Sequence, residues 1–330
     1  MNKKLYLIIV NYNSWKHSIE LIHSIYKNNI KNFQIIIIEN CSKDDSVNQL
    51  VRWLNGSEIL EINAKYYDER LDTRKNYVFI DEQNQKKPNN KSMFGKYEII
   101  LSKTRKNLGF AGANNFAINN FINLNEDSNI FFVNPDICLH KDAIYFADRL
   151  SNDNKEFIMG FNVMDYFNEN KKISIGGSKI DHGLSIVKNI TKIKDANSID
   201  YIYGGVMFTN TKSIKKIGLF PEDYFLYWEE ADLCMKARKL NIPLIISNKS
   251  FCYDKVGQSI GRGELSEYLF TYNSFIFYQK YFKRFKVKLI LKHSIRLIYK
   301  LINLNFNNAR GIIRGIFHYL NNKKNEYKTN

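Results

Sequence analysis

Two short, continuously apolar runs near the N-terminus constrain the fold most. They are LYLIIV at residues 5–10 and FQIIII at residues 33–38, and both are rich in β-branched side chains. Strands of this kind are covered on both faces, as in a parallel sheet between helices. Residues 14–27 place apolar side chains at spacings of three and four, which predicts a helix between the two strands. Strand, helix and strand form a βαβ unit with a right-handed crossover.

The α/β pattern continues along most of the chain. Further strands are predicted at 97–102, 130–133, 157–162, 203–209 and 243–247. Residues 55–97 interrupt the pattern with a polar, Tyr- and Asn-rich stretch, which we interpret as an insertion lying over the surface. The sequence therefore predicts an α/β domain over residues 1–265, with a mostly parallel central sheet.

The region 266–330 is predicted to be helical, aromatic and basic. At about 100° per residue, cations follow one another every fourth position along one side of a helix. They are Arg284, Lys288, Lys292, Arg296 and Lys300, and apolar residues fall mainly on the other side. This amphipathic region is either a solvated helix whose apolar side packs on the domain, or an interfacial anchor whose lysines contact anionic lipid.

The charge balance indicates an anionic partner. The 330-residue chain has 49 Lys and Arg against 33 Asp and Glu, a net charge of +16. We expect no nucleic-acid partner, because the chain has no nucleic-acid-binding motif and its aromatic residues cluster with carboxylates.

Four scattered cysteines indicate reduced thiols in a cytoplasmic protein. The sequence has no apolar stretch of about 18 residues that would predict a membrane-spanning helix.

Polar side chains follow three predicted strands at the points where the strands end. Asn11 and Asn13 follow the first strand, Glu39 follows the second, and Asp136 follows the strand at 130–133. Each residue alone suits a turn. However, open α/β sheets bind ligands beyond the carboxyl ends of their strands. Three such ends at one edge of the sheet therefore predict a binding site.

A Gly-rich turn, KNLGFAGANN, places Gly109 at the start of a predicted helix. Backbone N–H groups at a helix start suit a phosphate, and Lys106 lies nearby. The glycine spacing matches neither a dinucleotide fingerprint nor a Walker loop. The turn is therefore a candidate phosphate site without a specific motif.

Another predicted helix begins with three carboxylates, Glu229, Glu230 and Asp232. Acidic residues in a first turn stabilise the helix dipole, which is a structural explanation. The aromatic residues just before them, among them Tyr227 and Trp228, would form a platform of the size of a sugar ring. We favour a carbohydrate site in which Trp228, Tyr227 and Asp232 contact the acceptor.

Six blocks stand out in order along the sequence. They are IIVNYN (8–13), IIENCSKDDS (37–46), NLGFAGANN (107–115), NPD (134–136), the long block 204–238 and KVGQSIG (255–261). Together they resemble family 2 glycosyltransferases with the GT-A fold, a Rossmann-like fold of nucleotide-diphospho-sugar transferases, and specifically the rhamnosyltransferase-like branch of bacterial surface polysaccharide synthesis. They imply a GT-A domain over residues 1–265, followed by a helical basic C-terminal extension.

The resemblance assigns roles to matching residues. The donor would be held by Val10, Asn11, Tyr12, Asn13, Glu39, Lys106, Asn107, Gly109 and Asn134, with Glu39 where the family usually has Asp. Asp136, in place of the D-x-D motif, and Asp254, where the family has His, would bind Mg²⁺ or Mn²⁺. Glu230 would be the general base, with Glu229 as the alternative.

The expected reaction is an inverting, metal-dependent sugar transfer from a nucleotide diphosphate donor to a glycan or lipid-linked acceptor, in O-antigen or capsule synthesis. Rhamnose is the favoured sugar, and UDP-galactofuranose, UDP-glucose and UDP-N-acetylhexosamine are alternative donors. A non-catalytic sugar-binding protein and a basic nucleic-acid-binding protein are the remaining alternatives. We expect a cytoplasmic protein on the inner face of the cell membrane, bound to its anionic surface, and leave a homodimer open.

Overall fold

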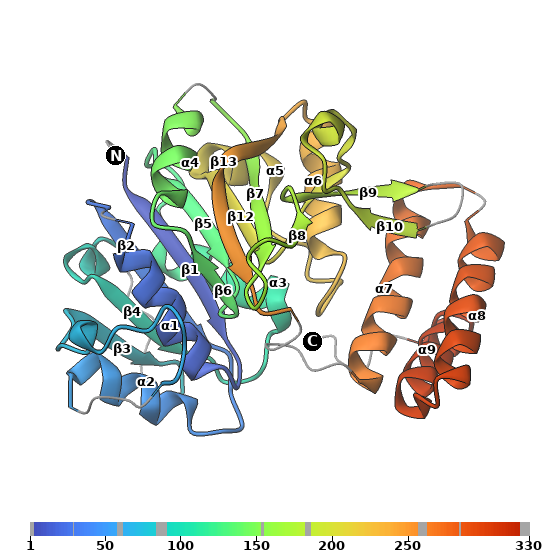
Figure 1. The fold of residues 1–330 in the computed structure, drawn as a ribbon, viewed down its shortest axis with the longest axis horizontal. Coiled ribbons are helices and arrows are strands. Elements are labelled where there is room, and N and C mark those ends of the chain that lie inside the picture. Colours follow the sequence, from blue (N-terminus) through green and yellow to red (C-terminus); the bar gives the residue numbers. More distant parts are fainter. Residues whose placement is uncertain are drawn as a thin grey trace.

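The computed structural model describes residues 3–28, 30–57, 62–83, 91–152, 155–181, 186–256, 263–283 and 285–323. Arg284 and residues 257–261 of the KVGQSIG block therefore lie outside the described residues. A central sheet with helices on both faces occupies most of the molecule, and the helices α7 to α9 form a layer at one end (Figure 1).

The N-terminal residues form the predicted βαβ unit. β1 (Leu5–Asn11) and β2 (Phe33–Glu39) pair in parallel, and α1 (Trp15–Tyr26) connects them. β5 (Asn129–Val133) pairs with β1 on its other side. The side chains of residues 5–9 and 34–39 are buried, as the continuous apolar runs predict for strands covered on both faces.

The central sheet has the strand order β3-β4-β2-β1-β5-β12-β7-β13-β6, with β8 paired to β7. The first five strands run parallel. β12 (Val206–Asn210) is antiparallel to both β5 and β7 (Ile158–Asp165). β13 (Leu244–Asp254) is parallel to β7 and antiparallel to β6 (Ile137–Leu139). The prediction of an α/β fold with a largely parallel sheet is confirmed.

Part of the stretch at 55–97 contributes to the sheet rather than only covering the surface. β3 (Tyr77–Asp81) forms an edge of the sheet and pairs in parallel with β4 (Ile99–Lys103). Phe94 is buried. Four of the five side chains of β3 are half-exposed, as expected for a strand at the edge of a sheet. A strand in this position does not need the continuous apolar run that marks the inner strands.

The remaining elements surround the sheet. The helices are α2 (Ser46–Asn55), α3 (Gly109–Phe121), α4 (Ala143–Ser151), α5 (Thr211–Ile217) and α6 (Glu229–Lys239), with 3-10 turns at Glu69–Leu71, Lys91–Lys96 and Ile193–Ser198. The strands are β8 (Lys172–Ser174) and a separate sheet of β9 (Gly177–Asp181), β10 (Ile186–Asn189) and β11 (Tyr201–Ile202). Figure 1 shows β9 and β10 extending towards α7.

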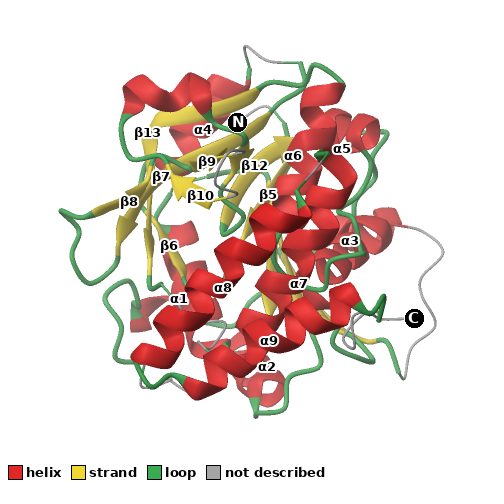
Figure 2. Cartoon of the chain, turned by 90° about the vertical axis from the view of Figure 1, so that its right-hand side faces the viewer, coloured by secondary structure: helices red, strands yellow, loops and turns green. Residues whose placement is uncertain are grey.

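The C-terminal region is helical, as predicted. It consists of α7 (Glu264–Tyr281), α8 (Lys286–Ile302) and α9 (Phe306–Leu320). Seen from this end of the molecule, α8 and α9 lie in front of α7 (Figure 2). α7 joins the layer to the α/β domain because its aromatic side chains pack in one core with Tyr224 and Trp228.

The orientation of α8 contradicts the first explanation of its amphipathic pattern, in which the apolar side packs on the domain; the interfacial anchor stays a prediction. Arg296 and Lys300, on the basic side, form ion pairs with Glu267 of α7. The apolar side faces outward, with Ile295 68% exposed. The lysine side is therefore the packing side, because α7 supplies acidic partners for it. In the described part of the chain, no helix combines the length and apolarity that crossing a bilayer requires.

Candidate active site

Two carboxylates that are far apart in the sequence lie at neighbouring strand ends. Asp136 lies in the turn between β5 and β6, and Asp254 is the last residue of β13. Asp254 pairs with Ile137 in the sheet, and the Lys255 N–H donates to the Asp136 carbonyl at 3.2 Å. Burial, and next the negative charge of Asp136, raise the pKa of the Asp254 carboxyl to about 6. The two carboxylates are thus close enough to repel each other.

The pair fits a hard divalent cation. Tyr203 donates its hydroxyl to Asp254 Oδ2 at 2.5 Å, and the Val256 N–H donates to Asp254 Oδ1 at 2.7 Å, so the carboxylate is held in place. Mg²⁺ is commonly bound by one or two carboxylates together with substrate phosphates and water. Among the described residues, no group of three His, Cys, Asp or Glu side chains could hold a metal alone. A cation held there would therefore need further ligands, such as phosphate oxygens or water.

The acidic start of α6 lies close to the same strand ends. The Glu230 side chain packs on Gly204, where an added Cβ would lie 3.2 Å from Glu230 Cδ. The next residue, Gly205, accepts the Asn134 N–H at 2.9 Å. Asn134 and Asp136 belong to one turn, so the segment 203–205 contacts both Glu230 and the Asp136 turn. The structure brings these distant acids to one end of the sheet.

The backbone before α6 is bent into an unusual conformation. Tyr227 and Trp228 have φ angles of 69° and 79°, in the left-handed region that bulky side chains rarely adopt. Asn273 of α7 donates to the Leu226 carbonyl at 2.7 Å, and Trp228 Nε1 donates to the Phe270 carbonyl at 3.1 Å. Such strain persists only where the surroundings enforce it, and it is common at functional sites. α7 therefore holds the bend that aims the two glutamates.

The two glutamates are buried carboxyls with raised pKa values. Their Oε2 atoms are buried and have no hydrogen-bond partner among the described residues. Burial raises the pKa of Glu230 to about 7, whereas burial and the charge of Glu230 raise the pKa of Glu229 well above its ordinary value. Near neutral pH, Glu230 can therefore exchange a proton. A pKa near the working pH suits a general base, and this favours Glu230 over Glu229.

Two of the three predicted acceptor contacts are occupied by other interactions. Trp228 is 4% exposed, and its ring centroid lies 4.9 Å from that of Phe277. Asp232 is fully buried and accepts from Lys280 Nζ at 2.6 Å and from the Tyr281 hydroxyl at 2.9 Å. We revise both assignments, because neither side chain is free to reach a sugar: they attach α6 to α7. Tyr227 remains a candidate, half-buried at the bend.

The Gly-rich turn does not present free amides to a phosphate. Its N–H groups at Leu108, Gly109 and Phe110 donate to Asn40 Oδ1, Asn107 Oδ1 and the Phe225 carbonyl, each at 2.9 Å. We therefore revise the phosphate role predicted for this turn, including Asn107; Lys106 is exposed beside it. Gly109 has φ +69°, and a Cβ there would lie 2.1 Å from the Phe225 carbonyl oxygen. The glycine permits the turn to approach the segment that leads into α6.

The predicted donor residues of β1 and β2 do lie together. Asn11 is paired with Glu39 across the two strands. Glu39 Oε1 accepts the Ser42 N–H at 2.8 Å, while Oε2 is buried without a partner among the described residues. Burial raises the pKa of this carboxyl. Val10 and Tyr12 are half-buried here, and Asn13 is exposed with φ 51°. The unpartnered oxygen of Glu39 leaves a buried polar atom available to a ligand at this end of the sheet.

Four neighbours of the site were missed in the sequence. Tyr203 binds Asp254, and Lys255 lies in an ion pair with Glu20 of α1. Lys255 Nζ also lies 2.9 Å from His17 Nδ1. Lys255 is 4% exposed, so its side chain is held in the interior directly after β13. Only the position of Lys255 in the KVGQSIG block could have drawn attention to it.

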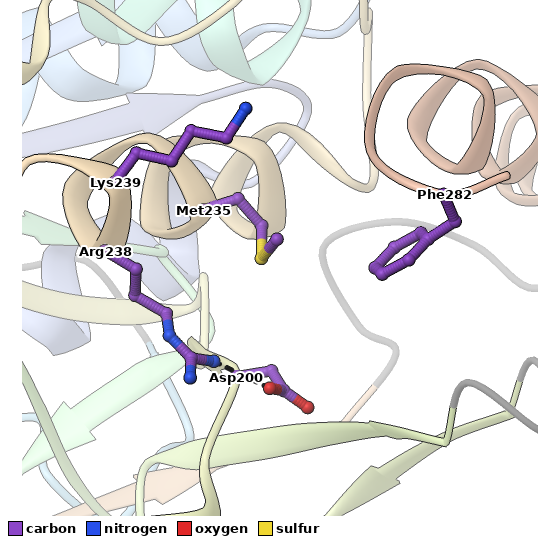
Figure 3. Close-up of a pocket in the computed structure, with 5 residues that line it drawn as sticks. All are labelled: Asp200, Met235, Arg238, Lys239 and Phe282. Carbon is purple, nitrogen blue, oxygen red and sulfur yellow. Dashed lines mark hydrogen bonds and ion pairs between the residues drawn. The ribbon is translucent and has the colours of Figure 1, made fainter.

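A hollow of about 360 Å³ lies elsewhere, between α6 and the end of α7 (Figure 3). It is lined by Asp200, Met235, Arg238, Lys239 and Phe282. Arg238 lies eight residues beyond Glu230, or roughly 12 Å along the helix at 1.5 Å per residue. The Arg238 guanidinium already forms an ion pair with Asp200, at 2.7 Å. The hollow is therefore separate from the acidic residues of the site.

The sheet and its covering helices form a GT-A-like fold, which solved glycosyltransferases share. The mannosyltransferase PcManGT from Pyrobaculum calidifontis, solved with GDP-Man and Mn²⁺, is 13% identical, with 98% of this chain and 88% of that one covered and a TM-score of 0.54. GalNAc-T7, solved with UDP, GalNAc and Mn²⁺, is 10% identical over 76% of this chain and 44% of that one, with a TM-score of 0.52. At such identities the likeness concerns the fold alone.

Sequence comparisons support a glycosyltransferase. Residues 6–73 match the family description Glycosyl transferase family 2. The low-salt glycan biosynthesis hexosyltransferase Agl10 of Haloferax volcanii is 24% identical over 144 residues, which are 41% of this chain and 45% of that protein. The chain thus matches less than half the length of this relative. The family 2 match covers β1, α1, β2 and α2, the part that carries Asn11 and Glu39.

Proposed function

We propose that this chain transfers a sugar from a nucleotide diphosphate donor to an acceptor hydroxyl, with inversion. The observation that carries the proposal is Glu230, whose pKa is raised to about 7 and whose side chain packs on the turn next to the Asp136–Asp254 pair. A proton acceptor and a carboxylate pair at one end of the sheet are what such a transfer needs. Asn11 and Glu39 lie at the end of β1 and β2, where the nucleoside would bind.

In the proposed reaction, Glu230 accepts the proton of the acceptor hydroxyl as its oxygen attacks the anomeric carbon. The new C–O bond forms on one face while the bond to the diphosphate oxygen breaks on the other. The diphosphate leaves with the bonding electron pair, so one displacement inverts the anomeric centre. Burial and the charge of Glu230 raise the pKa of Glu229, which favours the neutral form of Glu229 beside the base.

Asp136 and Asp254 would hold Mg²⁺ or Mn²⁺. Bound there, the cation would neutralise charge on the diphosphate leaving group. The residues fit this role because both carboxylates are buried and Asp136 raises the pKa of Asp254. The Mn²⁺ in two solved glycosyltransferases of this fold supports the proposal.

For the donor we propose dTDP-rhamnose first, on the sequence resemblance, with UDP-galactofuranose, UDP-glucose and UDP-N-acetylhexosamine as alternatives. The glycan named for Agl10 supports a glycan or lipid-linked sugar acceptor. Synthesis of a bacterial surface polysaccharide at the inner face of the cell membrane would bring donor and acceptor together. The changes from the family pattern at Glu39 and Asp254 favour one second candidate, a relative that binds sugar without turnover.

A panel of nucleotide sugars with Mn²⁺ tests the proposal. A ligand present at a concentration of 100 times its Kd stabilises the folded state by about 2.7 kcal/mol. The true donor should therefore raise the Tm more than its nucleotide alone does. The same donor should then be consumed with lipid-linked acceptors. Stabilisation without turnover across the acceptor panel would favour the sugar-binding candidate. An unchanged Tm with every nucleotide sugar would contradict both.

A further inference from the structure

The outer surface of α8 and α9 is unusually apolar. Of the nineteen exposed large apolar side chains among the described residues, twelve lie between residues 287 and 320. The most exposed of these are Val287, Ile295, Ile302 and Leu304, at 69%, 68%, 74% and 72%. Exposed apolar residues scattered singly need no explanation, but a concentration of this kind marks an interaction surface.

The exposed residues form one stripe on each helix. At about 100° per residue, five of the seven exposed large apolar residues described on α8 fall within roughly 80° of arc, and the other two, Tyr299 and Leu301, lie roughly 40° beyond its edges. The five are Val287, Leu291, Ile295, Ile298 and Ile302. On α9 the corresponding arc is roughly 60°, and its residues are Phe306, Ile313, Phe317 and Leu320. Figure 2 shows both helices on the outer side of the molecule, with α7 behind them. We call these nine residues the apolar face.

Both helices are fixed to α7 by ion pairs on sides other than the apolar face. Arg296 and Lys300 of α8 pair with Glu267, and the less exposed Arg314 of α9 pairs with Glu264. Arg296 also lies over the Phe270 ring, 4.8 Å from its centroid. The outward direction of the apolar face is therefore specified by ion pairs and does not result from a loosely attached helix.

The charge around the apolar face selects among occupants. Residues 283–323 contain ten Lys and Arg residues and no Asp or Glu. Lys286, Lys288 and Lys323 are exposed at helix ends, and Arg310 lies on the exposed side of α9. A second copy docking by this face would bring two sets of cations together with no acidic residue from this region to pair with them. An anionic lipid surface would instead neutralise them, and it would bury apolar side chains in its acyl boundary.

We propose that the apolar face of α8 and α9 docks on an anionic phospholipid bilayer and enters the headgroup–acyl boundary. The cations at the helix ends then contact lipid headgroups, while Arg296 and Lys300 keep their partners on α7. Attachment combines two contributions, apolar burial and charge, which differ in their response to salt. The proposal does not rest on the proposed transfer reaction, so either can fail while the other stands.

Co-sedimentation of the full chain with vesicles tests this docking. The probes are vesicles of phosphatidylcholine alone and of phosphatidylcholine with phosphatidylglycerol. The variant Leu291→Gln/Ile295→Gln/Ile298→Gln should lower the affinity for the mixed vesicles at least tenfold. The matched control Phe167→Gln/Ile193→Gln/Leu240→Gln changes three exposed apolar side chains outside this face and should stay within twofold of the unmodified chain. All six positions are exposed, so the Tm should be unchanged.

Three results would overturn the docking proposal. The first is unchanged vesicle binding by the α8 variant, because the apolar face would then not be buried in lipid. The second is equal binding to both vesicle types, which would remove the role of the cations. The third is a dimer in analytical ultracentrifugation that the α8 variant dissociates, without vesicle binding, which would assign the face to a second copy of the chain.

Discussion

Tyr203 and Asp254 lie 51 positions apart in the chain, and the Tyr203 hydroxyl donates a hydrogen bond of 2.5 Å to Asp254 Oδ2. This contact joins the turn on which Glu230 packs to the end of β13, beside Asp136. The proposed base and the proposed metal ligands are thus connected through a single short segment. A change at either one is expected to affect the other.

Replacing Glu230 by Gln should lower kcat by about 10²–10⁴, the usual contribution of a general base, while donor affinity is kept. In the unmodified chain, the carboxylate form is the active one. Because burial raises the pKa of Glu230 to about 7, activity should rise as the pH increases through 7. Initial rates from pH 5 to pH 9 measure this. Glu69→Gln, at an exposed position, is the control, and an activity rise centred near the ordinary glutamate pKa would refute the assignment.

Removing either carboxylate of the pair should abolish the response to metal. Asp136→Asn and Asp254→Asn should lose the Mn²⁺-dependent rise in Tm, because a single carboxylate remains. Tyr203→Phe keeps the ring and removes only the hydrogen bond to Asp254, so a reduced rise should remain. Asp45→Asn, at the exposed start of α2, should respond like the unmodified chain. A full Mn²⁺ response in Asp254→Asn would leave Asp254 without a metal role.

The buried ion pair of Lys255 and Glu20 should be coupled in stability. Their side chains are 4% and 1% exposed, so Lys255→Met leaves a buried carboxylate without its cation. Loss of one partner of such a pair costs about 3–5 kcal/mol. Adding Glu20→Gln should restore part of the loss, since the uncompensated charge is gone. Urea unfolding of the single and double variants measures the coupling, and purely additive losses would show that the pair does not act as a unit.

Gly109→Ala should destabilise the protein by at least about 2 kcal/mol, from the positive φ and the overlap together. The new Cβ would lie 2.1 Å from the Phe225 carbonyl oxygen, and the segment before α6 would have to shift. Activity should fall with stability because Glu229 and Glu230 follow that segment. Gly95→Ala, where a Cβ meets no atom within 4 Å, is the control for the substitution itself. A Tm equal to that of the control would contradict the close approach.

The parts of the fold that follow from short-range pattern could be predicted from the sequence. The runs at 5–10 and 33–38 became β1 and β2, because continuous apolarity over six residues specifies a strand covered on both faces. The placement of Asn11 and Glu39 side by side also followed, since parallel strands end at one edge. The helical C-terminal region was predicted by its periodicity.

Site details that depend on distant neighbours could not be predicted in the same way. The sequence alone predicts that Trp228 and Asp232 contact an acceptor sugar, yet α7 covers the Trp228 ring and Lys280 of α7 pairs with the Asp232 carboxylate. Tyr203 carries no sequence signal, because its importance comes from a partner 51 residues away.

By itself, the sequence determined the βαβ framework, the acidic residues at the strand ends and the amphipathic character of α8. Only the tertiary structure decided which side of α8 faces inward and which acid near α6 can exchange a proton near pH 7. The physical reason is that local pattern sets backbone conformation, whereas burial, ion pairing and pKa depend on atoms that other segments bring into contact. Glu267 pairs with the basic side of α8 and so turns it inward, and burial raises the pKa of Glu230 to about 7.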